Sequence, residues 1–498
     1  MAEFADSSGV ALPLPGAVLI AGAAAIAAIT LLFISSPFGP LSLALVGVIV
    51  LAAVWQGWLV SRRDPVQLAF FLMLFELVSE CAYIPDNLRP LASYGLTLLF
   101  CFPAIPLMWR AWKGPASGFK LYLVYYGWCL ITVAYSLAPT YSFARLLRTV
   151  LLFSGILLCV VRARQQGEVA RLVRNLMLAC IVVTLATAAA ALVLPHSRTW
   201  SDVLEPSGQL VASEYGQEEI SRFIGLFGEP NAVGEMVLVT VGLILTYFEF
   251  ATRTERKVLV ATVLLALALT GIADSRSGVL GLMLGGSLYL CWKYRFKGFL
   301  VVVSGCAMIV LGLTLAGPNF SIYIWRGDIW TATGRTDVWQ YALKQIAHRP
   351  ITGYGYDTAG AILSNRYFPL WWGPWDEGPH SSLHDGYISS MVGVGIPATI
   401  FWIFIMFRPW LTVFRQSEDP WRLKRMLFFL VIPLLFVNID ESMINDCAGP
   451  AGLLFAAVWA VAEQYRLVVS RRAATVDRQA LQDLPAAATA LRLAQSTR

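Results

Sequence analysis

Two histidines precede an apolar segment, at a place where an imidazole could take a proton from a substrate. His380 and His384 are four residues apart, and Asp385 follows directly. An imidazole titrates near neutral pH, so His384 is the candidate general base. The alternatives are a structural role and a zinc site at His380 and His384, which would need a third ligand from Asp376, Glu377 or Asp385. No complete ligand set is visible, so we expect no metal.

Five arginines are candidates for binding an anion, because a planar guanidinium donates paired hydrogen bonds to a phosphate. Arg276 lies in Asp274-Ser275-Arg276-Ser277-Gly278, between two apolar segments with almost no loop. An arginine at such a place is costly unless something pairs with it. The alternative to a ligand is an internal ion pair, for which the candidate partners are Glu76, Glu80, Glu229 and Glu235. The five arginines are Arg145, Arg148, Arg222, Arg276 and Arg335.

Aromatic residues between about 318 and 385 are candidates for stacking on sugar rings. Trp371, Trp372 and Trp375 form a cluster, and Tyr354 precedes it. The alternative is a belt of aromatic side chains at a membrane surface. The cluster lies within a loop rather than at the end of an apolar segment, which favours binding.

Motifs for nucleotide chemistry are absent from the sequence. It contains no GxxxxGK[ST], no strand-coupled GxGxxG and no Asp-x-Asp pair. ATP, NAD and metal-held nucleotide sugars therefore have no recognisable site. We expect an activated substrate that arrives preformed, no cofactor and no nucleic-acid partner.

Composition shows what must position these residues. The chain has 498 residues, of which 57% are hydrophobic and 14% charged, whereas soluble domains carry roughly 25% charged residues. Its apolar runs approach the roughly 20 residues that cross a bilayer as a helix, and they are too long for barrel strands. The first residues include Glu3 and Asp6, which is unlike a secretory signal. Eight cysteines show no CxxC motif or disulfide framework.

The fold class predicted from these runs is an all-α polytopic membrane protein with about 14 transmembrane helices (12–14). The segment at 426–438 is short, which explains the range. The predicted spans lie at about 13–35, 40–60, 66–84, 91–109, 118–137, 143–163, 171–194, 229–251, 258–273, 277–292, 298–317, 386–407, 426–438 and 447–465.

The distribution of Lys and Arg predicts the topology. Most of these residues fall in alternate loops and in the tail, which by the positive-inside rule puts those loops and both termini in the cytoplasm. The expected organisation is helices 1–11 in 1–317, a large periplasmic loop with short helices at 318–385, helices 12–14 in 386–466 and a cytoplasmic tail at 467–498. A second long outer loop is expected at 195–228. All four histidines fall on the outer side.

Five motifs, in this order, resemble the O-antigen ligase and Wzy-type polymerase superfamily, and most of all exopolysaccharide polymerases of the ExoQ type. The resemblance covers about residues 215–400. The motifs are Phe223-Ile224-Gly225-Leu226-Phe227-Gly228-Glu229-Pro230-Asn231, Ser275-Arg276-Ser277-Gly278, Gly334-Arg335-Thr336-Asp337-Val338-Trp339, His348-Arg349-Pro350-Ile351-Thr352-Gly353-Tyr354-Gly355 and His384-Asp385-Gly386-Tyr387.

The resemblance implies a GT-C-like glycosyltransferase of the bacterial inner membrane that needs neither nucleotide nor metal. It would move a glycan from undecaprenyl diphosphate to an acceptor hydroxyl on the periplasmic face, with a Wzx-type flippase and a chain-length regulator as possible partners. By analogy, Arg276 and Arg335 would bind the diphosphate and His384 would be catalytic. Other residues expected to contact substrate are Arg145, Arg148, Arg222, Glu229, Asn231, Tyr354, Trp371, Trp372, Trp375, His380 and Asp385. Asp385 departs from the common His-Asn pair.

Two other functions fit parts of the sequence. A ligase that transfers glycan to lipid A-core would share the chemistry and differ only in its acceptor. A flippase for lipid-linked sugars would also have many spans and intramembrane charges such as Glu76 and Glu235. Transporters place such charges near the midplane and often show internal repeats. Here the charges lie at the outer edge and the polar residues gather in one asymmetric loop, which favours a transferase over a flippase. The sequence does not distinguish a polymerase from a ligase, and the function predicted first is the polymerisation of repeat units.

Overall fold

The computed structural model describes residues 64–79, 94–101, 117–193, 225–227, 230–273, 275–315, 335–362, 383, 385–416, 422–439 and 449–470. All regular secondary structure in these ranges is helical. Five helices are long and apolar enough to cross a membrane: Pro139–Gln165, Val169–Ala189, Arg253–Ala273, Ile396–Arg415 and Pro450–Ser470. The chain is therefore a helical, multi-pass membrane protein. The spans expected at 13–35 and 40–60 lie outside the described residues.

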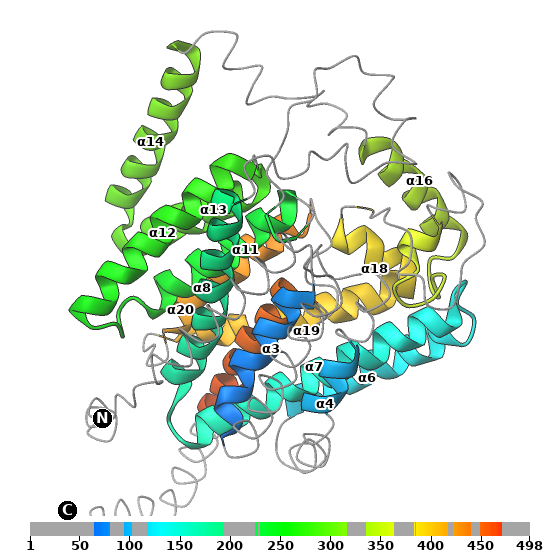
Figure 1. Ribbon diagram of the computed structural model, residues 1–498. Coiled ribbons are helices and arrows are strands. Elements are labelled where there is room, and N and C mark those ends of the chain that lie inside the picture. The colour runs from blue at the N-terminus through cyan, green and yellow to red at the C-terminus, as the bar shows by residue number, and fades with distance from the viewer. Residues whose placement is uncertain are drawn as a thin grey trace, which may run out of the picture.

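Most of the described helices pack together in a bundle, and α14 (Phe296–Leu315) projects from it next to α13 (Arg276–Tyr294) (Figure 1). Those before residue 250 are α3 (Pro65–Ser79), α4 (Leu96–Cys101), α6 (Ser117–Val133), α7 (Pro139–Gln165), α8 (Val169–Val193) and α11 (Pro230–Tyr247). The following ones are α12 (Arg253–Ala273), α13 (Arg276–Tyr294), α14 (Phe296–Leu315), α16 (Arg335–His348), α18 (Gly386–Val394), α19 (Ile396–Arg415), α20 (Leu423–Met426), η5 (Leu427–Val431) and α21 (Ile432–Val437). The helix Pro450–Ser470 ends the described chain.

The expected span at 386–407 is two helices rather than one. Gly395 separates α18 from α19 with a φ of 86°, a backbone conformation that a side chain disfavours. The amide of Ile396 donates instead to the carbonyl of Pro350 (2.8 Å). A turn of the preceding loop is thus joined to the break between the two helices.

Helix α13 lies in the middle of the second half of the bundle and packs against α11, α21 and η5. Its glycines allow close contact: a methyl group on Gly278 would collide with the carbonyl oxygen of Gly234 on α11, and one on Gly281 with Leu238 and Val437. Small residues at helix contacts are how membrane helices gain close van der Waals packing. This packing fixes where α13 begins.

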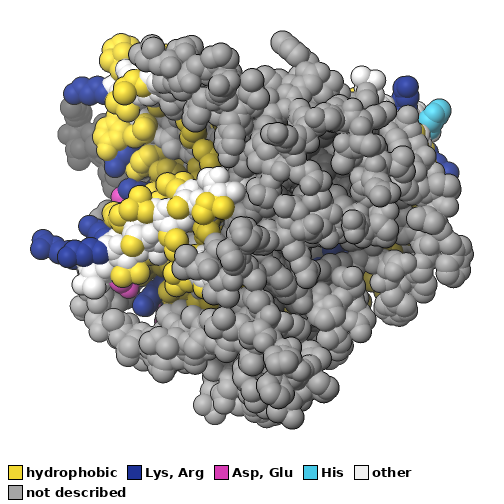
Figure 2. Space-filling model, turned by 45° about the horizontal axis from the view of Figure 1, so that its top comes forward, with side chains coloured by type: hydrophobic (Ala, Val, Ile, Leu, Met, Phe, Trp, Pro, Cys, Tyr) yellow, Lys and Arg dark blue, Asp and Glu magenta, His cyan; other side chains and the backbone are white. Residues whose placement is uncertain are grey.

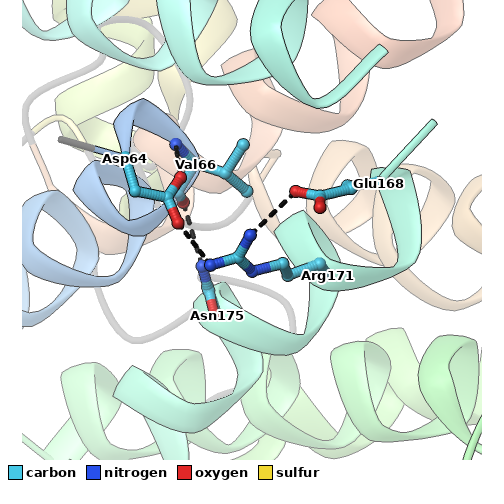
Figure 3. Close-up of polar contacts among 5 residues, drawn as sticks. All are labelled: Asp64, Val66, Glu168, Arg171 and Asn175. Atoms are coloured by element: carbon cyan, nitrogen blue, oxygen red, sulfur yellow. Dashed lines mark hydrogen bonds and ion pairs between the residues drawn. The ribbon is translucent and has the colours of Figure 1, made fainter. Parts of the chain in front are cut away.

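One end of the bundle gathers paired charges, and we call it the basic end. Figure 3 shows its best-connected group. Asp64 accepts from the amide of Val66 (3.1 Å) at the start of α3 and also pairs with Arg171 of α8. Arg171 donates to Glu168 (2.9 Å) as well, and the Asn175 side chain donates to the carbonyl of Val66 (2.9 Å).

Further ion pairs lie at the basic end, some between helices and one, Arg466 with Glu463, within the final helix. Arg174 faces Glu255 at 3.6 Å, Glu249 pairs with both Arg422 and Arg425, and Arg466 pairs with Glu463 at 2.7 Å. The end of α7, the start of α8, the α11–α12 turn and the start of α20 thus share one end of the bundle, as the alternation of Lys and Arg along the sequence predicts.

Candidate functional site

The opposite end, which we call the site end, is where α11, α13, α16 and α18 begin. Ser275 is the N-cap of α13 and is 3% exposed. A methyl group on Gly234, in the second turn of α11, would overlap the hydroxyl of Ser275. Helix α13, whose first residue is Arg276, therefore begins beside the first turns of α11. These turns contain the half-buried Asn231.

The starts of α16 and α18 meet in a similar way. The indole of Trp339, one turn after Arg335, donates to the carbonyl of Leu383 (2.9 Å), and Leu383 directly precedes His384 in the sequence. Leu383 also packs in a small apolar cluster with Ala342 and Ile346 of α16 and Val392 of α18. The motifs that contain Arg335 and His384 are thus held together by one hydrogen bond and one apolar cluster.

Helix α21 lies between the pair of α11 and α13 and the pair of α16 and α18. Its Val437 lies against Gly281 of α13, and the carbonyl of the next residue, Asn438, accepts from the amide of Gly386 (2.8 Å). Asp385 caps α18, because its carboxylate accepts from the amide of Ile388 (2.8 Å). The residue that departs from the common His-Asn pair thus serves as a helix cap.

The arrangement therefore brings the N-termini of four helices to the region around the end of α21. The first amide N–H groups of a helix lack partners within it, and the helix dipole adds roughly half a positive charge there. At α18, the amides of Gly386 and Ile388 already donate to Asn438 and Asp385, so an anion would be attracted chiefly by the starts of α11, α13 and α16. Arg276 and Arg335 are the first residues of α13 and α16. A region built in this way attracts an anion such as a diphosphate.

Arg145 and Arg148 each form an ion pair with a carboxylate. Arg148 is 4% exposed and donates to Glu76 (2.7 Å), whose carboxylate also accepts from the amide of Gly449 (2.8 Å). This is the internal ion pair that the sequence left open for Arg148. Arg145, half-buried, donates to Asp357 (2.7 Å). The sequence did not suggest Asp357 as its partner.

The loop at 350–358 explains the glycines of the fourth motif. The amides of Tyr354 and Gly355 donate to the carbonyls of Val392 and Gly393 (both 2.9 Å), at the end of α18. Gly353 and Gly355 have φ values of 62° and 118°, and side chains there would collide with Gly393 and with Ser136 respectively. These glycines serve a close backbone contact rather than a ligand.

The same loop is bonded to the α6–α7 turn on its other side. The amide of Tyr356 donates to the hydroxyl of Thr132 (3.1 Å), and the hydroxyl of Tyr356 donates to that of Thr149 (3.2 Å). The hydroxyl of Tyr135 donates to the carbonyl of Thr352 (2.8 Å). The loop is therefore fixed between α6–α7 and α18–α19. Sequence analysis missed this set of positioning residues, although the tyrosines of the motif and the turn were a signal for it.

Tyr354, a candidate for sugar stacking, is partly used inside the protein. Its hydroxyl donates to Gln345 (2.9 Å), and the guanidinium of Arg349 lies 4.7 Å from its ring centroid. Seven further candidates lie outside the described residues: Arg222, Glu229, Trp371, Trp372, Trp375, His380 and His384. Among the residues that the structure does describe, no group of three His, Cys, Asp or Glu side chains could hold a metal ion.

Part of the chain is similar to a known family. The family model described as O-antigen ligase matches residues 258–403, a range that begins within α12, contains α13, α14, α16 and α18, and ends within α19, while α11 and α21 lie outside it. No curated protein matches the chain. The family match covers Arg276, Arg335 and His384, whereas α6 and α7 lie before it.

Proposed function

We propose that this chain, which belongs to the O-antigen ligase superfamily through residues 258–403, transfers a glycan from undecaprenyl diphosphate to a sugar hydroxyl and thereby polymerises exopolysaccharide or O-antigen repeat units. The family supports a membrane glycosyltransferase of the ligase and polymerase type. The donor, the acceptor, the GT-C-like architecture and the periplasmic position of the site are our proposals. The observation that carries them is the meeting of four helix N-termini at the site end.

The leaving group determines what this end must supply. When the glycosidic bond breaks, its electron pair goes to the lipid diphosphate, which gains negative charge. Helix N-termini that are fixed before the reaction stabilise that charge without having to reorganise. Arg276 and Arg335, at the first positions of α13 and α16, would add paired donors to the phosphate oxygens. This accounts for catalysis without a metal in the proposed reaction.

The acceptor hydroxyl must lose a proton as it attacks the anomeric carbon. We assign that proton to His384. The cap that Asp385 places on α18 and the bond from Trp339 to Leu383 (2.9 Å) hold the residues on both sides of it. Candidate contacts to the sugars are Arg222, Glu229, Asn231, His380 and the tryptophans Trp371, Trp372 and Trp375.

Arg145 and Arg148 take positioning roles in this proposal. Arg148 is buried against Glu76, and this ion pair joins α7 to α3. Arg145 pairs with Asp357 and so fixes the loop that supports α18. The orientation that follows from the Lys and Arg distribution puts the site end in the periplasm and the basic end in the cytoplasm of an inner membrane.

The test is turnover by purified protein with a lipid-linked repeat unit as donor, with products resolved on a gel. A ladder of lengths is the result expected for a polymerase. One transfer to lipid A-core would show a ligase instead. If no transfer occurs and the lipid-linked glycan moves across a vesicle membrane, the chain is a flippase. A Wzx-type flippase and a chain-length regulator are the partners to co-purify.

A further inference from the structure

Six basic side chains lie exposed where α12 begins and where α13 meets α14. Because α12, α13 and α14 follow one another through short turns, these ends lie at the same end of the bundle, the basic end. We call this surface the α12–α14 edge, and it consists of Arg253, Arg256, Lys257, Lys293, Arg295 and Lys297.

The α12–α14 edge has few counter-charges: its one carboxylate among the described residues, Glu255 in the first turn of α12, faces Arg174 of α8. Arg171, Arg174 and Arg425 all face carboxylates. None of the six residues of the edge forms an ion pair with any residue that the structure describes. Arg256 donates to the carbonyl of Phe248 (3.2 Å), and Lys293 lies over aromatic rings. With respect to the residues that the structure describes, these positive charges are therefore available to a partner.

Aromatic side chains surround the edge at the same level. All of these side chains are exposed, and Phe296 is the most exposed at 70%. The group consists of Phe250, Trp292, Tyr294, Phe296 and Phe299. Aromatic residues gather where lipid headgroups meet the hydrocarbon. Figure 2 shows Lys and Arg side chains along the left of this face, next to a yellow hydrophobic surface. Exposed apolar residues such as Val258 and Leu264 continue along α12 away from the charges.

We propose that the α12–α14 edge binds the headgroups of anionic phospholipids. The unpaired guanidinium and ammonium groups would pair with lipid phosphates, while the aromatic rings lie at the headgroup level and the exposed helix faces contact acyl chains. Clusters of four to eight basic residues next to a membrane helix have this property. The proposal does not depend on the reaction that the site end performs.

The experiment measures how many lipids the purified full-length protein retains from micelles of mixed phosphatidylglycerol and phosphatidylcholine, by native mass spectrometry. The wild-type protein should prefer phosphatidylglycerol, and raising the salt concentration should weaken that preference. The double variant Lys257→Gln/Lys297→Gln should lower the preference by about fivefold for each charge removed. Both side chains are exposed and have no hydrogen-bond partner among the described residues, so the variant should fold.

The matched control removes the same charge elsewhere, with Lys344→Gln on α16 and Arg415→Gln at the end of α19. Both residues are also exposed. This control should retain the preference for phosphatidylglycerol. The proposal is overturned if the wild type shows no preference, if the edge variant keeps it, or if the control loses as much as the edge variant.

Discussion

At the basic end, carboxylates pair with arginines near the starts of α8 and α20, whereas α13 and α16 at the site end begin with the arginines that we propose bind a diphosphate. Glu249 pairs with both Arg422 and Arg425, and Arg171 pairs with both Asp64 and Glu168. At the site end, α13, α16 and α18 begin around the end of α21. An arginine that already pairs with a carboxylate has less to offer a substrate. Helix starts with an arginine at the first position attract an anion from outside.

The largest expected effect separates chemistry from binding at the site end. His384→Ala should lower single-turnover transfer by about 10²–10⁴, because a general base acts in the transition state. Donor affinity should stay near that of the wild type. The measurement is donor binding beside transfer in the same preparation. Full transfer by the variant would remove His384 from the mechanism and leave it a structural residue.

Next comes the ion pair of Arg148 and Glu76, in which both side chains are buried. Arg148→Met leaves Glu76 buried with a charge that lacks its main partner, and such a loss costs about 3–5 kcal/mol. Thermal unfolding in detergent should therefore occur well below the wild-type temperature. The double variant Arg148→Met/Glu76→Gln should recover part of the loss. Arg145→Met, one turn away on α7, is the control and should cost less, because Arg145 is 26% exposed.

If a Glu76→Gln protein unfolds at the wild-type temperature, then the pair does not hold α3 and α7 together. In that event Arg148 would return to the set of residues that could contact substrate.

Arg276 and Arg335 should show an intermediate effect that falls on binding as well as on rate. Charge-assisted hydrogen bonds are worth roughly 1.5–3 kcal/mol each, so Arg→Ala should lower transfer by about one to two powers of ten. Arg→Lys should rescue poorly, because an ammonium lacks the paired donors. Donor affinity and transfer rate are measured together. Rescue by lysine would show that only the charge matters.

The smallest effect is expected at the basic end. Glu249→Gln removes one partner of Arg422 and Arg425, all at least partly exposed. Exposed pairs are worth about 0–1 kcal/mol, so the unfolding temperature should change little and transfer not at all. A large loss of transfer would mean that the two ends are coupled, against the contrast drawn above.

Sequence patterns predicted several parts of this site and missed others. The short link around Arg276 indicated a helix start, and Glu76 was among the possible partners of an arginine. Asp357 could not be paired with Arg145 from sequence, because 212 residues separate them and nothing local marks the contact. The break at Gly395 was missed because an apolar run with the length of a span hides it. The local signals were Gly395 itself and Pro397, which lies in the first turn of α19.

The carboxylate of Glu76 has a consequence for how the chain is assembled. It bonds Arg148 and also the amide of Gly449, which is 373 residues away along the chain. During synthesis, the bilayer receives Glu76 long before the final helix Pro450–Ser470 leaves the ribosome. The contact between Glu76 and Gly449 can therefore form only after the chain before the final helix has been inserted. This carboxylate thus joins the earliest described helix to the last one.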